Sequence, residues 1–418
     1  MRSFILFFLF LFLPFIVISE QDEYSFDLES IKKKPFSFGG YLEFRPVFSI
    51  LDFNSGSYKL RFYNRDEGNS ISEYNFNALL DLSYEKSIFK AAVRSNILIS
   101  RAFDEWEQNT SLYEAYFSIK PSNSASFEIG KKRLKWGKGY AWNPVAFIDR
   151  RKNPNDPELA LEGFTIAAIN YIKSFSGKLK TISFTAVLLP VSDNFNSDFG
   201  INGHINFGGK VYFLFNDTDI DIMFLSGKSM LNRYGIDFSR NLGSNFEVHG
   251  ELAYIPDHNR NNAFSYLLGF RLLTKTDITF FLEYYKNGYG LLPEEMEDYY
   301  LKIDQAYQAF LLTENDVYLK SLFEDSDPEF RSFAPMRDYL YMRMSWKEPG
   351  DILYFIPSLT TIFNMTDYSF LIAPELLYTP VTNFELRAKI SIFVGEKGSD
   401  FGEKQNSLRF EFRGRYYF

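Results

Sequence analysis

Histidine, the side chain best suited to proton transfer near neutral pH, occurs at His204, His249 and His258. Only His249 has neighbours that suit catalysis, because Glu247 and Glu251 flank it two residues away on either side. A carboxylate can orient such a base, but no nucleophile is marked beside it, and a serine–histidine pair cannot be identified from spacing. The sequence shows no glycine-rich phosphate loop, zinc-binding histidine pair or nucleotide fingerprint. We therefore expect a non-enzymatic protein without metal or cofactor, in which His249 is simply hydrogen-bonded.

Charged side chains offer a second kind of chemistry, the electrostatic guidance of solutes. Basic residues gather in the first and last segments of the chain, and acidic residues gather in the middle. The basic set is Arg45, Lys59, Arg61, Arg387, Lys389, Arg409, Arg413 and Arg415, and the acidic set is Asp219, Asp221, Asp237, Glu247, Glu251 and Glu283. If the chain closes into a cylinder, the two sets form opposite walls. Opposed walls set up a transverse field that orients dipolar solutes and disfavours apolar ones.

A basic and aromatic segment, Lys131–Lys152, has eight basic residues against Asp149 alone. Inside a cylinder it would be a constriction loop that attracts anions and offers aromatic faces to sugar rings. Equally, it would be an exposed loop that contacts the phosphates of lipopolysaccharide. The residues that would narrow the passage are Lys132, Arg133, Lys135, Trp136, Trp142, Arg150 and Arg151.

An acidic segment, Pro293–Phe330, has eleven acidic residues against Lys302 and Lys320. Its centre, Tyr299–Leu322, has helix-like apolar spacing. Loops this long are usually functional or mobile. We expect a solvated surface loop, with a lid over the basic segment and a calcium site as weaker alternatives.

The elements that position these groups have a period of two. Apolar and polar residues alternate from Tyr41 onward in segments of about 8 to 14 residues, most clearly in Asn383–Phe393. Alternation places successive side chains on opposite faces of a β-sheet. A soluble β-sandwich alternates too, but these segments approach the ~9–11 residues that cross a bilayer, and their polar faces carry many charges. The fold class is therefore all-β: a closed antiparallel transmembrane β-barrel with a wet lumen.

Connections alternate between short and long, as in barrels with short periplasmic turns and long extracellular loops. The longest are 131–161 and 288–336. Nineteen alternating segments can be recognised, the first two at 41–48 and 57–63. Bacterial single-chain barrels have even numbers, so we expect about 18 strands, with 16 or 20 as alternatives. Either 41–48 is not a full span, or a further strand lies within a long loop.

Composition excludes other classes of protein. The 418 residues are 19% aromatic, yet only 46% hydrophobic, with a mean hydropathy of −0.20. Beyond the N-terminus no run of ~20 apolar residues exists, which excludes a helical membrane protein, and the aromatic content argues against disorder. A net charge of −8 gives no nucleic-acid-binding field. Without cysteine there is no disulfide or thiolate site.

The N-terminus is predicted to be a secretory signal peptide over residues 1–19, because Arg2 precedes an apolar run that ends at a small-residue pair, Val17 and Ser19. Residues 20–34 then form a short periplasmic segment, too short for a plug domain, and 35–418 form the barrel.

The last strand, Leu408–Phe418, has Tyr416 and Phe418 in an apolar row and Arg413 in the opposite row. It resembles the closing strand of Gram-negative outer-membrane proteins, which ends in an aromatic residue. The resemblance implies that Tyr416 and Phe418 form a signal for the barrel-assembly machinery. Gly130–Pro144, with its Trp136–Gly137 pair, looks like a segment of porin-like barrels, including alginate-export-type proteins, in which the loop folds towards the lumen.

These patterns favour a porin-like channel in the outer membrane for passive diffusion of small polar or anionic solutes, with lipid and lipopolysaccharide as further partners and no nucleic acid. An export or assembly barrel for a surface polysaccharide, and a non-conducting adhesin or structural barrel, remain open as alternatives.

Overall fold

The computed structural model describes residues 34–65, 68–103, 105–257, 261–324 and 328–418. The predicted signal peptide, and the N-terminal segment apart from Lys34, lie outside the described residues. The chain divides into Met1–Pro35 and Phe36–Phe418, and the second unit is the one described below. Among the described residues, no helix has the length and apolar composition needed to span a bilayer.

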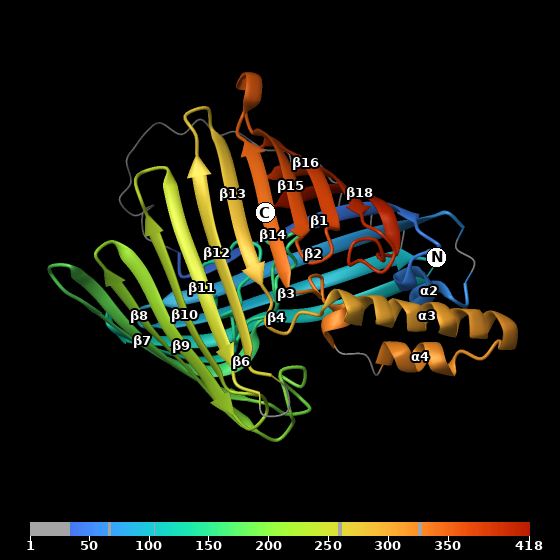
Figure 1. Ribbon diagram of the computed structural model, residues 1–418. Helices are drawn as coiled ribbons and strands as arrows, with labels where there is room; N and C mark the ends of the chain where they lie inside the picture. Colours follow the sequence, from blue (N-terminus) through green and yellow to red (C-terminus); the bar gives the residue numbers. More distant parts are fainter. Residues whose placement is uncertain (1–33, 66–67, 104, 258–260, 325–327) are drawn as a thin grey trace, which may run out of the picture. The chain divides into compact units, whose positions relative to one another are not determined.

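Phe36–Phe418 forms one sheet of 18 antiparallel strands that closes on itself, because β1 pairs with both β2 and β18 (Figure 1). The strands are β1 (Phe36–Leu51), β2 (Ser70–Lys86), β3 (Phe89–Ala102), β4 (Glu105–Ser122), β5 (Ala125–Lys132), β6 (Phe164–Ser174), β7 (Leu179–Pro190), β8 (Ile205–Phe215), β9 (Thr218–Gly227), β10 (Arg233–Asn241), β11 (Phe246–Ile255), β12 (Ala263–Leu273), β13 (Ile278–Lys286), β14 (Asp338–Trp346), β15 (Phe355–Asn364), β16 (Phe370–Val381), β17 (Phe384–Val394) and β18 (Asn406–Tyr417). The helices are α2 (Gly56–Phe62), α3 (Pro293–Thr313) and α4 (Val317–Glu324), with 3₁₀ turns η2 (Pro328–Arg331) and η3 (Pro349–Asp351). The predicted fold class and the preferred strand number are confirmed.

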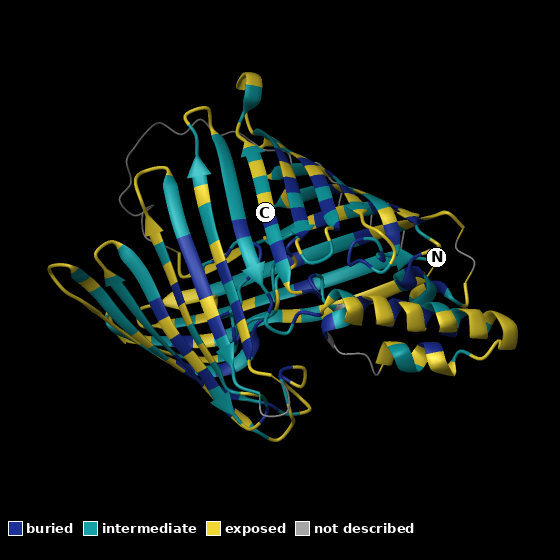
Figure 2. Cartoon of the chain, viewed as in Figure 1, coloured by how far each residue is buried: buried dark blue, intermediate teal, exposed yellow. Residues whose placement is uncertain are grey.

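The alternation read from the sequence is visible as alternating exposure along several of the strands (Figure 2). In β1, Leu42, Phe44 and Phe48 are exposed on the outer face, whereas Glu43 is buried on the inner face. A barrel has no free edge to expose unpaired backbone groups. At the closing seam, Gly40 and Phe418 exchange N–H···O bonds of 3.2 Å. A Cβ at Gly40 would lie 2.0 Å from the carbonyl oxygen of Leu79, so only glycine fits there.

The two rims differ as expected. On one rim the connections are mostly short: Asn216 and Asp217 alone join β8 to β9, both with positive φ (48° and 57°), the conformation that two-residue hairpins need. On the other rim lie α2, the 133–163 connection, α3 with α4, and the 395–405 connection. We call this second edge the long-loop rim.

The predicted strand at 57–63 is wrong, because these residues form helix α2. Ser55 caps the helix, since its side chain accepts a bond from the backbone N–H of Tyr58. Tyr58 and Phe62, four residues apart, are buried in one cluster with Leu51 and Ile71. Apolar residues at 58, 60 and 62 fit a period of two, and a run this short does not distinguish strand from helix. Neither explanation offered for the odd count holds: 41–48 lies in the full strand β1, and the extra segment is the helix.

The helical spacing predicted within the acidic segment is confirmed as α3 and α4. Glu314 ends α3 in a left-handed conformation, φ 55°. Met296, Tyr299 and Ile303 on α3 are buried in a cluster that also contains Trp142 and inward-facing residues of β12 and β14–β16. Apolar packing therefore continues from the helices into the lumen.

Candidate functional site

The connection between β5 and β6, residues 133–163, folds into the lumen, and we call it the lumenal loop. Trp136, Val145 and Ile148 pack against inward-facing apolar residues of the wall, among them Ile166 and Met223. Trp142 stacks on Tyr285 with ring centroids 5.1 Å apart. The fold towards the lumen that the resemblance implied is thus what the structure has.

Two buried carboxylates of the wall hold the start of this loop by its backbone. Glu251 accepts bonds of 2.6 Å from the N–H groups of Lys138 and Gly139. Glu283 accepts from the N–H of Ala141 at 2.8 Å and from that of Tyr140. Charge-assisted bonds of this kind are about twice as strong as neutral ones. A Cβ on Gly139 would lie 2.1 Å from the carbonyl oxygen of Trp142, so glycine permits this close approach.

The far end of the loop is held by the opposite wall. The carboxylate of Asp156 lies 2.6 Å from Arg413 of β18 and 3.7 Å from Arg387 of β17. The ammonium of Lys389 donates to the carbonyl oxygen of Asn155. The loop therefore crosses the lumen and is fixed at both walls.

Most members of the predicted basic set face the lumen, but not as an unopposed wall. Arg45, Arg387, Lys389, Arg409, Arg413 and Arg415 lie on the inner faces of β1, β17 and β18. Carboxylates stand among them: Arg415 lies 2.6 Å from Glu43, and Arg413 lies 2.8 Å from Glu411. Alternation along β1 and β18 already places Glu43 and Glu411 in the same inner rows as the arginines, but the predicted basic wall did not count them.

Lys59 and Arg61 are corrections, since they lie in α2 at the long-loop rim and not on a strand. Lys59 pairs with Asp304 of α3 at 2.5 Å, and Arg61 donates to Gln405 at 2.9 Å.

The predicted acidic residues lie on the inner faces of β9, β10, β11 and β13. Most of them already contact another side chain or the backbone of the lumenal loop. Lys138 of the loop lies 2.9 Å from Asp221 and 3.9 Å from Asp237. Tyr212 donates to Asp219, and Ser239 donates to Glu247 at 2.9 Å. The Nε2 atom of His249 lies 2.9 Å from Glu283, so the predicted hydrogen-bonded histidine is confirmed.

The constriction candidates divide into three groups. Trp136 and Trp142 are only 4% and 7% exposed, so the expected aromatic faces for sugar rings are covered by packing, which is a correction. Four cations are paired: Lys132 with Glu128, Arg133 with Asp149, Arg150 with Asp198 and Arg151 with Glu329. Lys135 is exposed, and the structure gives it no ion-pair partner among the residues it describes.

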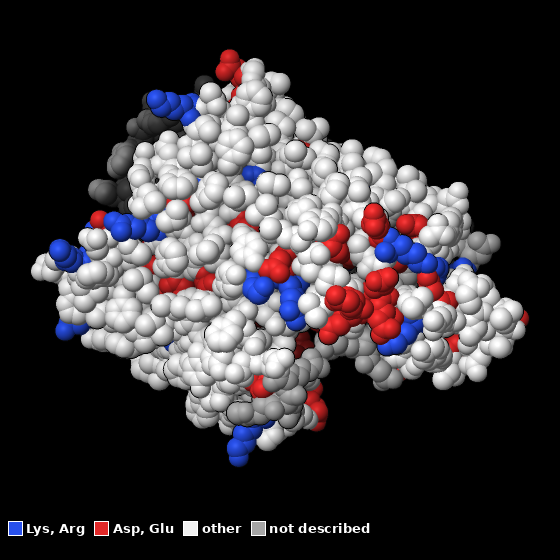
Figure 3. All heavy atoms as spheres, viewed as in Figure 1, with Lys and Arg blue, Asp and Glu red and all other residues white. Residues whose placement is uncertain are grey.

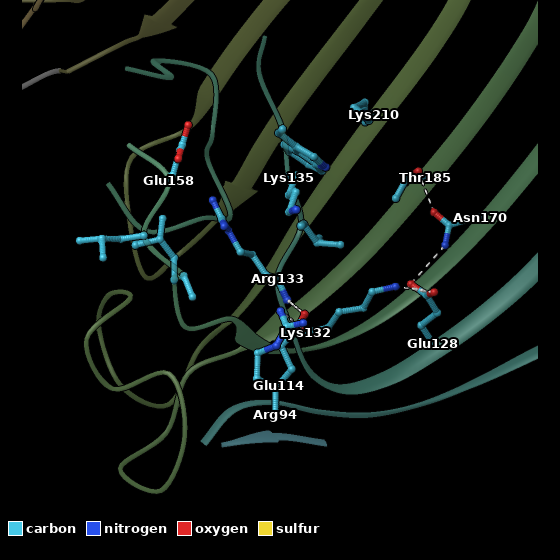
Figure 4. A pocket seen from close by; sticks show the side chains of 15 residues that line it. Arg94, Glu114, Glu128, Lys132, Arg133, Lys135, Glu158, Asn170, Thr185 and Lys210 are labelled. Carbon is cyan, nitrogen blue, oxygen red and sulfur yellow. Dashed lines mark hydrogen bonds and ion pairs between the residues drawn. The ribbon is translucent and has the colours of Figure 1, made fainter. Parts of the chain in front are cut away.

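Lys135 borders a cavity of about 590 Å³ between the lumenal loop and the inner face of β3–β8 (Figure 4). Five basic and three acidic side chains line this cavity. The basic ones are Arg94, Lys132, Arg133, Lys135 and Lys210, and the acidic ones are Glu114, Glu128 and Glu158. Asn170 and Thr185, 2.8 Å apart, add neutral polar groups. Arg94 and Lys210 were not predicted, although both stand at inward positions of alternating segments. No cluster of three or more potential metal ligands occurs in the described part of the chain.

Titratable groups in the lumenal loop respond to its burial. Burial raises the pKa of Asp149 above its usual value, against the opposing charge of Arg133. Burial likewise lowers the pKa of Lys152, whose ammonium donates to the carbonyl of Gly139 at 2.7 Å. Asp156 differs: burial opposes its ionisation, but Arg413, Arg387 and Lys389 hold its pKa below 3.8. Its ion pairs therefore favour the charged, docked loop.

The acidic segment packs onto the long-loop rim. The sequence predicted a solvated surface loop, and this expectation is corrected. Acidic side chains gather over α3 in the space-filling view (Figure 3). Asp304 receives both Lys59 and Lys397. Arg151 of the lumenal loop lies 3.0 Å from Glu329, so the two long loops are in contact, as the lid alternative required.

No model of a known protein family matches this sequence, and no curated protein matches it. Many solved structures match by fold. A BenF-like porin from Pseudomonas fluorescens has a TM-score of 0.56 at 12% identity, covering 92% of this chain and 98% of the porin. OpdQ from Pseudomonas aeruginosa has 0.53 at 13%, covering 91% and 99%. Wzi from Escherichia coli, described as a carbohydrate-binding β-barrel involved in capsule assembly, has 0.53 at 10%, covering 93% and 86%.

At these identities the likeness concerns the fold alone. Together with the closed sheet, it establishes that this chain has the fold of the outer-membrane porins, a closed antiparallel β-barrel of 18 strands.

Proposed function

We propose that this barrel lies in a bacterial outer membrane and acts as a passive channel for small anionic solutes, which pass between the lumenal loop and β3–β8. The membrane placement is supported by the apolar outer face and by the porin-like fold. Barrels of 16–18 strands commonly enclose an aqueous channel. We further propose that residues 1–19 are cleaved on export and that Tyr416 and Phe418 are read by the barrel-assembly machinery.

One observation carries the preference for anions: exposed Lys135 borders the 590 Å³ cavity, in which basic side chains outnumber acidic ones. The other basic groups there have carboxylate neighbours, so Lys135 supplies the net positive charge to a passing solute. Low-dielectric walls focus such a field.

The opposed-wall field expected from the sequence is a weaker basis for function. The acidic wall is largely occupied by Lys138 and the loop backbone, and the basic wall holds its own carboxylates. These groups position the loop, and the loop then defines the remaining passage.

The test is single-channel recording in planar bilayers with the purified protein. The proposal predicts discrete conductance steps and a reversal potential that favours anions under a salt gradient. Lys135→Glu should shift that reversal potential towards cations. A complete lack of conductance steps would contradict the channel.

A role in polysaccharide assembly, as in the description of Wzi, is less well supported. Its sequence argument depended on the aromatic faces of Trp136 and Trp142, and both indoles are buried. We also propose no enzymatic role, since the side chain of His249 is buried, only 4% exposed, and its partner Glu283 also binds the backbone of the lumenal loop.

A further inference from the structure

The hydrogen-bond ladder that closes the barrel is broken at a proline. Gly40 and Phe418 exchange both backbone bonds, and antiparallel pairs alternate between bonded and non-bonded positions. Pro46, an even number of residues further along β1, therefore stands at a bonded position opposite Phe412 of β18. Proline has no N–H to donate. Within these two fully described strands, pairing accordingly lapses at Arg45 and Pro46 and then resumes in the same register, whereas β1 pairs with β2 there without a break.

A second proline breaks the ladder on the other side of the β17–β18 hairpin. Ala373 and Pro374 of β16 have no partner in the fully described β17, although the pairs before and after them share one register. Pro374 keeps its pairing with β15. By that register Pro374 stands opposite Ile390 of β17. Ile390 pairs with Phe410 of β18, two residues from Phe412 of the first break. Two residues of strand advance about 7 Å, so both breaks lie at nearly the same position along the hairpin.

Each break makes local opening less costly. One interstrand bond is missing on each side of the hairpin, and the carbonyl oxygens of Phe412 and Ile390 have lost their ladder donors. Within a bilayer, water does not replace such a donor, and an unsatisfied buried carbonyl raises the free energy of the closed wall. A bent conformation that lets lumenal water reach these oxygens therefore loses less than it would in a complete ladder.

Side chains do not brace the hairpin from outside at this point. A hollow of about 420 Å³ lies on the outer face, over both strands of the hairpin and the adjoining part of β1. Ala388 and Pro46 leave space there because their side chains are short, and Ile390, Phe410 and Phe412 surround it. Packing against other parts of the protein therefore does not oppose an outward bend.

This hairpin holds the far end of the lumenal loop. The groups that bind Asp156 and Asn155 are Arg387, Lys389 and Arg413. The start of the loop is held differently, by Glu251 and Glu283 on β11 and β13. The ladders of these two strands with their neighbours run without a break over their described lengths. One end of the loop is thus fixed to a wall with complete pairing, and the other end to a wall with interrupted pairing.

We propose that the β17–β18 hairpin is a flexible panel of the barrel wall, and that its outward bending at Pro46 and Pro374 withdraws the far end of the lumenal loop and widens the passage. The start of the loop stays in place, so the loop moves as a flap about Glu251 and Glu283. The flexibility of the panel does not depend on the channel proposed above, whereas the widening of the passage rests on it.

Hydrogen–deuterium exchange of the full chain in detergent, read by mass spectrometry, tests the panel. We expect the amides of β17 and β18 to be less protected than those of β11 and β12. Pro46 and Pro374 belong to the outer rows of their strands, where valine suits a strand. Pro46→Val and Pro374→Val restore the missing donors and should raise the protection of the facing β18 and β17 amides about tenfold each, the effect of one hydrogen bond.

The matched control is Pro357→Val. Pro357 stands at the end of the β14–β15 ladder, on a strand that does not adjoin the hairpin, so this change should leave the protection of β17 and β18 as in the wild type. Equal protection of β17–β18 and β11–β12 in the wild type would overturn the panel. Equal protection of the hairpin in Pro357→Val and in the double variant Pro46→Val/Pro374→Val would exclude the prolines as its cause.

Single-channel recording tests the link to the lumenal loop. Wild-type channels should show brief excursions to higher conductance, and the double variant should show them about tenfold less often, for the same reason. Unchanged excursions in a double variant whose hairpin is better protected would overturn the link. If neither protein conducts, the channel proposal fails, and the exchange measurement still decides whether the panel exists.

Discussion

The carboxylate of Glu251, on β11, accepts a hydrogen bond of 2.6 Å from the backbone N–H of Gly139 in the lumenal loop. A charged group of the wall thereby fixes the main chain of a loop that crosses the lumen. Burying a carboxylate is expensive unless several donors satisfy it, and Glu251 also receives the N–H of Lys138 and the side chain of Asn143. The main role of the acidic wall is therefore to anchor the loop, and its electrostatic effect on solutes is secondary.

Removing this anchor should widen the passage. We expect Glu251→Ala to free the backbone donors of the loop, at a cost of about 1–3 kcal/mol, and to raise the single-channel conductance. The control is Glu247→Ala, on the same inner row, whose partner is Ser239 and not the loop. Equal conductance in wild type and Glu251→Ala would refute the anchoring role.

Gly139→Ala tests the close approach independently of charge. Its Cβ would lie 2.1 Å from the carbonyl oxygen of Trp142 and 2.9 Å from Leu267, so the loop must shift. We expect a lower unfolding temperature and faster protease cleavage within 133–163. Gly414→Ala, whose Cβ has 3.9 Å of room, should leave both unchanged. If the two alanine variants behave alike, the packing of the loop start is not as described.

Docking of the far end of the loop should depend on pH. Because Arg413, Arg387 and Lys389 overcome the cost of burial and lower the pKa of Asp156, this carboxylate stabilises the docked loop above pH 3.8. That contribution is lost as the pH falls through the lowered pKa. Conductance noise from loop motion should therefore rise below pH 3.8. Asp156→Asn should show the raised noise already at neutral pH, and a variant that stays quiet there would exclude this mechanism.

Asp304 is predicted to hold α3 on the rim, since Lys59 and Lys397 both reach it and lower its pKa against the effect of burial. Asp304→Asn should speed proteolysis of α3 and α4 several-fold. The matched change Asp298→Asn removes only an exposed pair with Lys302, and pairs of this kind contribute little to stability. Identical cleavage rates for the two variants would show that α3 is held by apolar packing alone.

The sequence could predict much of the fold because alternation is a local property. In β18 the alternation of polar and apolar residues predicts the face on which each side chain lies. As expected, Arg413 is buried and Phe412 is exposed. The strand predicted at 57–63 was wrong because the spacing of Tyr58 and Phe62 fits a helical period as well as a strand period. What decides between them is the cluster with Leu51 and Ile71, which forms only in the folded chain.

The site was less predictable because it depends on which strands the lumenal loop contacts. The spacing of Glu251 and Glu283 places both inside, but nothing in the sequence pairs them with the backbone of 138–141. Burial of Trp136 likewise depends on inward-facing residues of distant strands. Arg94 and Lys210 could have been found by applying the alternation rule to every strand.

Ion selectivity of single channels before and after Lys135→Glu tests the central proposal most directly. The wild type should select anions. A charge reversal at about 5 Å from the ion path raises the energy of an anion by about 1.7 kcal/mol and lowers that of a cation by about as much in water-like surroundings. Before screening by salt, the anion-to-cation permeability ratio should therefore fall by about two orders of magnitude. An unchanged ratio in a conducting Lys135→Glu channel would contradict a solute path past this residue.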